Sequence, residues 1–162
     1  MSIYAYTVPV LVRGLTTLSA YMDKAEAFAA ERGIDPATLV NACLAPDMLP
    51  LSGQVQRASD TAKGSIQRLT GLTAPSFPDT ETTLADLKDR IARTIAFVET
   101  ATPDLFDGAE ERSIDLRILT LSGADYPAHF MLPNFFFHLA TAHAILRQAG
   151  LPIGKKDYLG IA

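Results

Sequence analysis

The sequence predicts an all-α protein, a four-helix bundle with a short strand or hairpin inserted before the last helix. Three observations indicate this class. Four segments repeat apolar residues every three or four positions, glycine or proline follows each segment, and one short stretch alternates with period two. Residues three and four apart share one face of a helix, so each segment has an apolar stripe to bury. Packing the stripes together gives one core.

The length and composition fit a single globular domain that spans residues 1–162. Of the 162 residues, 48% are apolar and 20% are charged, and one core usually serves about 100 to 200 residues. The net charge of −4 leaves no basic surplus for phosphates. No apolar run reaches the roughly 18 residues of a membrane span. Neither nucleic acid nor a membrane is therefore an expected partner. A single cysteine fits a reducing cytoplasm, where we expect the protein to act.

The first stripe predicts a helix of about 28 residues, roughly 42 Å long at 1.5 Å per residue. Gly33 follows its last charged turn, where glycine commonly ends a helix. Pro9 either kinks this helix or marks its true start. The residues of the stripe are Tyr4, Val8, Leu11, Leu15, Leu18, Met22, Ala25 and Ala29.

A short helical turn and a second long helix follow. Asp35 and Pro36 form an N-cap and first-residue pair, and the turn they open extends to Asn41. The second long helix begins near Pro50 and ends at Gly71. Its stripe consists of Leu51, Val55, Ala58, Ala62, Ile66 and Leu69.

The third long helix is predicted over residues 84–98. Thr82 or Thr83 caps it, Asp86 places negative charge in its first turn, and Pro103 stops it. With the last helix, these segments favour an antiparallel bundle. The longer second and third connections leave its topology open.

Residues 112–122 alternate with period two, which predicts a short strand or small hairpin. Ser122 can cap a helical turn directly after it. The last helix is predicted over residues 131–149, because Gly150 and Pro152 are stop signals.

Apolar residues on this last helix extend beyond its stripe, because Phe136, Phe137 and Ile145 lie outside it. A helix that is apolar on most sides is buried on most sides. The helix therefore packs centrally, or part of it meets another subunit. Phe137 points furthest from the stripe, so we expect a homodimer that buries this side chain.

The three histidines do not have the spacing of a metal site on one helix. His138 and His143 are five residues apart, which separates them by about 140° around a helix. Neither E-x-x-H nor H-E-x-x-H occurs. Structural or surface histidines are therefore favoured, no metal is assigned, and no cofactor is expected.

His138 has Asn134 four residues before it, at the margin of the apolar face. This pair either lines a cavity inside the bundle or fixes helix packing through hydrogen bonds. Packing is favoured, because no second catalytic residue type lies nearby in the sequence.

Asp47, between two prolines, either projects into the bundle or caps the helix after Pro50, and capping is favoured. Gln54 and Gln56 could reach a pocket from the start of that helix. Cys43 is flanked by Ala42 and Leu44, which do not activate a thiol, so we expect a small buried hydrophobe. No catalytic residue is assigned, because serine elbows, phosphate loops and dinucleotide fingerprints are absent.

Three stretches resemble an uncharacterised bacterial family, a domain-of-unknown-function branch of the DinB-like (YfiT-like) four-helix-bundle superfamily. The most specific lies at the start of the last helix and continues past its end, the second precedes and opens the second helix, and the third lies near the C-terminus. They are Leu132-Pro-Asn-Phe-Phe-Phe-His138 with Ala144-Ile-Leu-Arg147 and Gly150-Leu-Pro-Ile-Gly-Lys155, then Leu44-Ala-Pro-Asp-Met48 with Pro50-Leu51 and Gln54-Val-Gln56, and Lys156-Asp-Tyr-Leu-Gly160.

The superfamily resemblance implies a bundle and often a dimer. In many members three histidines bind a divalent metal, one from the second helix and an H-x-x-x-H pair from a later helix, and some members transfer low-molecular-weight thiols. Here the matching pair is Asn134 and His138, and residues 51–69 contain no histidine. Asparagine is a poor ligand for zinc or nickel. The resemblance therefore implies a bundle whose metal triad is incomplete.

Two hypotheses follow. The first is a small-ligand-binding or pseudo-enzymatic homodimer, whose cavity is lined by Asp47, Gln54, Asn134 and His138. The alternative is a transferase or hydrolase of the DinB type, using His138 with Asp47 as acid and base or an unusual metal set.

Overall fold

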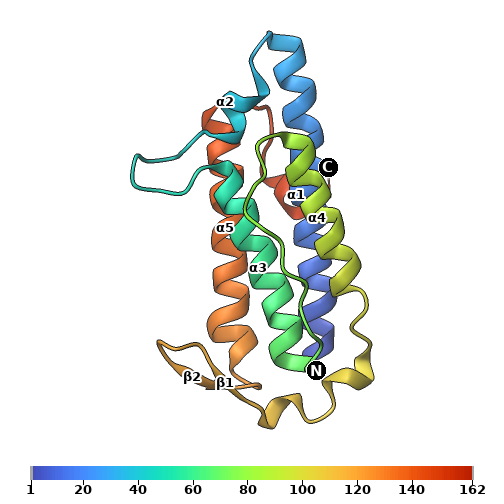
Figure 1. The fold of residues 1–162 in the computed structure, drawn as a ribbon. Coiled ribbons are helices and arrows are strands. Elements are labelled where there is room, and N and C mark those ends of the chain that lie inside the picture. Colours follow the sequence, from blue (N-terminus) through green and yellow to red (C-terminus); the bar gives the residue numbers. More distant parts are fainter. Residues whose placement is uncertain (1, 162) are drawn as a thin grey trace.

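The structure is a computed structural model that describes residues 2–161. Four long helices pack side by side, which confirms the predicted all-α bundle (Figure 1). None of the helices in the described range is both long and apolar enough to cross a membrane. The long helices are α1 (Ile3–Arg32), α3 (Leu51–Thr70), α4 (Leu84–Val98) and α5 (Leu132–Gln148).

The four helices form a ring in which α1 and α3 each contact both α4 and α5. In Figure 1, α1 and α5 run in one direction and α3 and α4 run in the other. The sequence favoured an antiparallel bundle and left its topology open; in the structure the neighbouring helices α3 and α4 are parallel. The reason is the connection over residues 71–83, which returns along the bundle to the end where α3 began (Figure 1).

The helix ends follow the capping signals of the sequence. Thr83 opens α4 in a capping box, since its Oγ1 accepts the Asp86 N–H at 3.1 Å and the Asp86 carboxylate accepts the Thr83 N–H at 2.9 Å. Gly33 and Gly71 end α1 and α3 with φ of 63° and 83°, a conformation that favours glycine. The helix α1 begins at Ile3 and continues through Pro9, so this proline is not its start.

The connection between α4 and α5 contains the predicted hairpin. Strand β1 (Ser113–Asp115) pairs antiparallel with β2 (Thr120–Ser122), and Ile114 lies opposite Leu121. The sequence indicated a helical turn after Ser122, where Ser122 Oγ accepts the Asp125 N–H at 3.1 Å, but not the π-helical turn η3 (Pro127–Met131) that leads into α5. It did not indicate the C-terminal helix α6 (Lys155–Leu159). The remaining short elements are α2 (Pro36–Val40), η1 (Pro103–Phe106) and η2 (Ala109–Glu111).

The predicted stripes form the core. The stripe residues on α3 from Leu51 to Leu69 are fully buried, as are Leu11, Leu15 and Leu18 on α1. The prediction that Cys43 is a buried hydrophobe was wrong, because Cys43 is exposed. It lies in the loop between α2 and α3, whose prolines prevent a regular helix from carrying its side chain inward.

Helix α5 packs between α1 and α3, which accounts for most of its surplus apolar character. Ile145 is fully buried and Phe136 is half-buried. Phe137 differs, because 55% of it is exposed to solvent.

Candidate functional site

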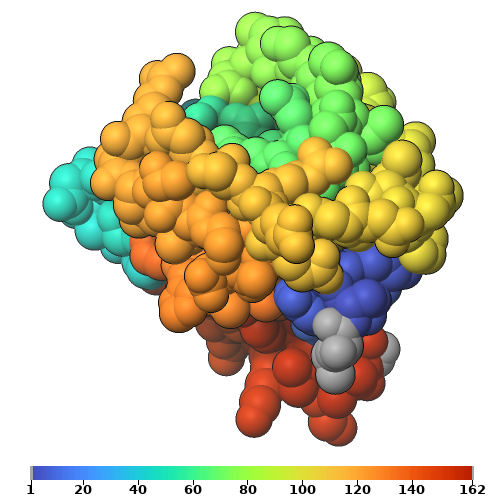
Figure 2. Space-filling view, turned by 90° about the horizontal axis from the view of Figure 1, so that it is seen from below, coloured from blue at the N-terminus to red at the C-terminus, as the bar shows by residue number. Residues whose placement is uncertain are grey.

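The candidate site is a groove between α3 and α5 with a volume of about 280 Å³. Figure 2 shows the surface hollowed between the orange segment that leads into α5 and the green segment of α3. Three of the four predicted site residues meet here, since Asn134 and His138 line the groove and Gln54 binds His138. The lining residues are Arg57, Asp60, Thr61, Arg68, Tyr126, Phe130, Asn134 and His138.

Gln54 determines which nitrogen of His138 carries the proton. Its Nε2 donates to the Leu49 carbonyl at 3.0 Å, which turns Oε1 toward His138 Nδ1 at 2.8 Å. An amide oxygen only accepts, so Nδ1 is the protonated nitrogen and Nε2 holds a lone pair. Within residues 2–161, His138 Nε2 has no hydrogen-bond partner. The site therefore offers one free imidazole acceptor.

The pKa of His138 keeps this acceptor neutral. Burial lowers the pKa of His138 below its ordinary value, and the positive charge of Arg57 lowers it further. The imidazole is therefore uncharged at neutral pH.

Asn134 is oriented by a second chain of hydrogen bonds. Thr61 Oγ1 donates to the Arg57 carbonyl at 2.7 Å and accepts from Asn134 Nδ2 at 2.8 Å. This arrangement leaves Asn134 Oδ1 free to accept. The groove thus has two acceptors on successive turns of α5, and both are positioned by α3.

A superfamily metal does not fit this donor set. The α3 side chains that bond this α5 pair are Gln54 and Thr61, neither is a histidine, and both already orient the α5 side chains. Among the described residues, no three His, Cys, Asp or Glu side chains lie close enough together to hold an ion. One imidazole and one amide oxygen are too few ligands.

Asp47 lies apart from this groove. It is exposed in the loop between α2 and α3, and it is not among the lining residues. It does not cap α3 either, because the N-cap is Pro50 and no side chain supplies a cap hydrogen bond.

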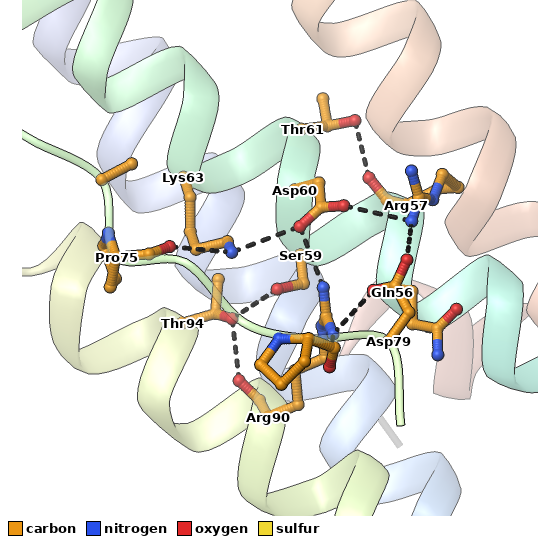
Figure 3. A network of polar contacts seen from close by, with 12 residues as sticks. Gln56, Arg57, Ser59, Asp60, Thr61, Lys63, Pro75, Asp79, Arg90 and Thr94 are labelled. Atoms are coloured by element: carbon orange, nitrogen blue, oxygen red, sulfur yellow. Dashed lines mark hydrogen bonds and ion pairs between the residues drawn. The ribbon is translucent and has the colours of Figure 1, made fainter. Parts of the chain in front are cut away.

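Next to the groove, a buried arginine joins three carboxylates that come from α3 and the connection before α4 (Figure 3). Arg90 of α4 is fully buried, and its guanidinium also donates to the Pro78 carbonyl at 3.2 Å. Burial alone would raise the pKa of Glu81, but hydrogen bonds from Arg90 and Gln56 hold that pKa below its ordinary value. The nitrogen–oxygen distances from Arg90 are 2.9 Å to Asp60, 3.0 Å to Asp79 and 2.9 Å to Glu81.

This network reaches the groove through Arg57 and Asp60, which belong to both. Arg57 pairs with Asp60 at 3.3 Å and with Asp79 on the connection. Lys63 also pairs with Asp60, at 3.2 Å. The α3 side of the groove is therefore anchored to the connection and to α4.

The other two histidines lie outside the groove. His129 is exposed. His143 Nδ1 lies 2.7 Å from Tyr21 Oη, and burial lowers the pKa of His143 and raises that of Tyr21. This neutral pair connects α5 to α1 and explains His143 as a packing residue.

Sequence reasoning missed six lining residues, but a signal exists for three of them. Tyr126 and Phe130 precede Asn134 and His138 at intervals of four, which is one line along a helix face. Thr61 lies four residues after Arg57 on α3. Residues on the two helices can be assigned to one site only once α3 and α5 are known to be neighbours.

Comparison with known proteins agrees with this architecture. A sequence model of a domain of unknown function, DUF1993, matches residues 3–159. A crystal structure of a DinB family member protein from Shewanella denitrificans is 42% identical, covers 98% of this chain and 92% of its own, and superposes with a TM-score of 0.93. No curated protein matches the chain. The chain belongs to the DUF1993 family and has the helical-bundle fold of a DinB family protein.

Proposed function

We propose that the protein binds a small molecule in the groove between α3 and α5, with neutral His138 as the central hydrogen-bond acceptor. One observation carries this proposal: Gln54 fixes the proton on Nδ1, so the lone pair on Nε2 is left without a partner among residues 2–161. A half-buried acceptor at a concave surface lacks a donor, and a ligand with a hydroxyl or amine can supply one.

A binding role is better supported than acid–base catalysis. His138 Nδ1 is paired with an amide oxygen, and in catalytic dyads a carboxylate at this position stabilises the imidazolium. Asp47 is exposed outside the groove. Asp60 is near, but its two oxygens are paired with Arg57, Lys63 and Arg90. No carboxylate is therefore available to act with His138.

A fragment screen by ligand-detected NMR tests this proposal, using wild-type protein, His138→Ala and the matched control His129→Ala. His129 is exposed and outside the groove, so its loss leaves the site intact. We expect a set of mutually competing fragments that bind wild type and His129→Ala and lose binding to His138→Ala. Circular dichroism checks that both variants fold.

Two results would contradict the proposal. One is the absence of any fragment whose binding depends on His138. The other is a stoichiometric metal ion, found after metal-replete expression and lost in His138→Ala, which would favour the alternative of a metal-dependent transferase or hydrolase.

We also propose that the protein is a homodimer that buries Phe137. The exposed fractions of Phe137 and Leu49 are 55% and 48%. The Leu49 carbonyl accepts from Gln54, which binds His138, the residue next to Phe137. These contacts connect the segments that carry the two residues, and the exposure of both apolar side chains supports an interface on this part of the surface.

A further inference from the structure

Resting on the proposed binding role of the groove, we propose that its ligand is a small organic monoanion with an apolar body. Arg68 holds the anionic end, and His138 accepts a hydrogen bond from a hydroxyl or amine at the other end. Four features of the groove support this ligand class: its charge balance, the position of Arg68, the spacing of the two ends and the state of His138.

The charges around the groove leave Arg68 as a cation without a counterion. The neighbouring network is balanced, because three carboxylates and three cations pair with one another. Arg68 forms no ion pair within residues 2–161, although it lines the groove. One negative charge on a ligand would complete the balance. The network consists of Asp60, Asp79 and Glu81 with Arg57, Lys63 and Arg90.

Gly64 makes room for the Arg68 guanidinium within the groove. A Cβ at Gly64 would lie 2.5 Å from Arg68 Nη1 and 3.5 Å from Cζ, so the guanidinium occupies the space that any other residue would fill. The same guanidinium lies 6.0 Å from the centre of the Tyr126 ring, which also lines the groove. Arg68 is exposed, and its guanidinium lies over Gly64 on α3, where a ligand in the groove can reach it.

The two ends are separated by the length of a small molecule. Gly64, beside the Arg68 guanidinium, is seven residues from Arg57, about 10 Å along the helix. Arg57 lies beside His138, whose pKa it lowers. The volume of 280 Å³ holds about nine water molecules at roughly 30 Å³ each. Phe130, stacked on Tyr126 with ring centres 5.9 Å apart, provides an aromatic wall for the body of the ligand.

The His138 end selects a donor and disfavours a second anion. Neutral Nε2 and Asn134 Oδ1 are both acceptors, so a carboxylate placed against them would meet lone pairs. A hydroxyl or amine satisfies them. The groove therefore distinguishes a monoanion with a donor from a dianion.

Isothermal titration calorimetry with phenolic acids tests this assignment. The probes are para-hydroxybenzoate, para-hydroxyphenylacetate and para-hydroxyphenylpropionate, each compared with its methyl ester and its para-methoxy analogue. We expect at least one acid to bind wild type more tightly than both of its analogues. Hydrogen bonds to charged groups are strong, so Arg68→Gln is expected to lower the affinity for that acid about tenfold or more. The affinity for the ester is expected to be unchanged.

Two further variants separate binding from folding. Gly64→Ala displaces the guanidinium, so it is expected to lower the affinity for the acid. The melting temperature is expected to be unchanged or higher, because alanine has a higher helix propensity than glycine. Arg32→Gln is the matched control, since Arg32 also lies over an aromatic ring, Phe28, but outside the groove. It is expected to bind the acid like wild type.

The outcomes distinguish this inference from the proposed function. The inference is overturned if no acid of the series binds, if the esters bind as tightly as the acids, or if Arg68→Gln behaves like Arg32→Gln. In those cases, neutral fragments whose binding depends on His138 would still support a binding groove. If no fragment depends on His138 either, the proposed function fails as well.

Discussion

At the scale of single residues, the state of His138 depends on hydrogen bonds that begin at the Leu49 carbonyl. That carbonyl accepts a hydrogen bond from Gln54 Nε2, and Gln54 Oε1 accepts one from His138 Nδ1–H. The sequence indicated Gln54, Asn134 and His138 because they stand near helix starts or at the margin of an apolar face. It did not indicate Thr61 and Arg68, because spacing within one helix carries no information about which helix lies beside it.

The pKa of His138 is the first residue-scale prediction. Burial and the Arg57 charge both lower it, so we expect NMR titration to give a value below about 6.5, the ordinary value for histidine. Arg57→Gln removes one of the two causes and is expected to raise this pKa, whereas Arg32→Gln leaves it unchanged. An unchanged or lower pKa in Arg57→Gln would contradict the electrostatic explanation.

The same shift determines how stability depends on pH. The folded protein binds a proton at His138 less readily than the unfolded chain, so the contribution of His138 to stability is complete above the unfolded pKa of about 6.5 and is lost as the pH falls through the lower folded pKa. In His138→Gln, this part of the decrease in the free energy of unfolding at low pH, measured by urea unfolding, is expected to be absent.

At the scale of elements, the connection over residues 71–83 is held in place although it contains no helix or strand. Lys63 donates to the Pro75 carbonyl at 3.1 Å, and the Phe77 ring lies 4.0 Å from Lys63 Nζ and 4.4 Å from the Arg93 guanidinium. The sequence predicted a longer connection here, between the helix that ends at Gly71 and the one over residues 84–98. It could not predict that this connection covers Arg90, because burial of a charged side chain depends on partners brought from α3.

Breaking this network is expected to destabilise the protein strongly. Arg90→Gln leaves Glu81 and the other carboxylates without their buried counterion, which typically costs about 3–5 kcal/mol in the free energy of unfolding. Lys88→Gln is the control, because its pair with Asp23 is exposed and such pairs contribute about 0.2–1 kcal/mol. Urea unfolding measures both. Similar losses in the two variants would contradict a structural role for the buried network.

At the scale of the whole molecule, local patterns determined the helices but not their directions. The long helices have the predicted boundaries to within a few residues, because caps and stop residues are local signals. The parallel pair α3 and α4 follows from the path of the connection between them (Figure 1). That path depends on Arg57, Lys63 and Arg90, which attach the connection along its length.

The assembly of the molecule is tested through Phe137. If this side chain is buried between two copies, wild-type protein is expected to have twice the chain mass of 17.4 kDa in size-exclusion chromatography with light scattering. Phe137→Glu is expected to reduce that mass to one chain, because a charge in an apolar interface is left unpaired. Ile118→Glu is the matched control, since Ile118 is 80% exposed on the hairpin. A wild-type monomer at high concentration, or equal effects of the two substitutions, would show that Phe137 does not form the interface.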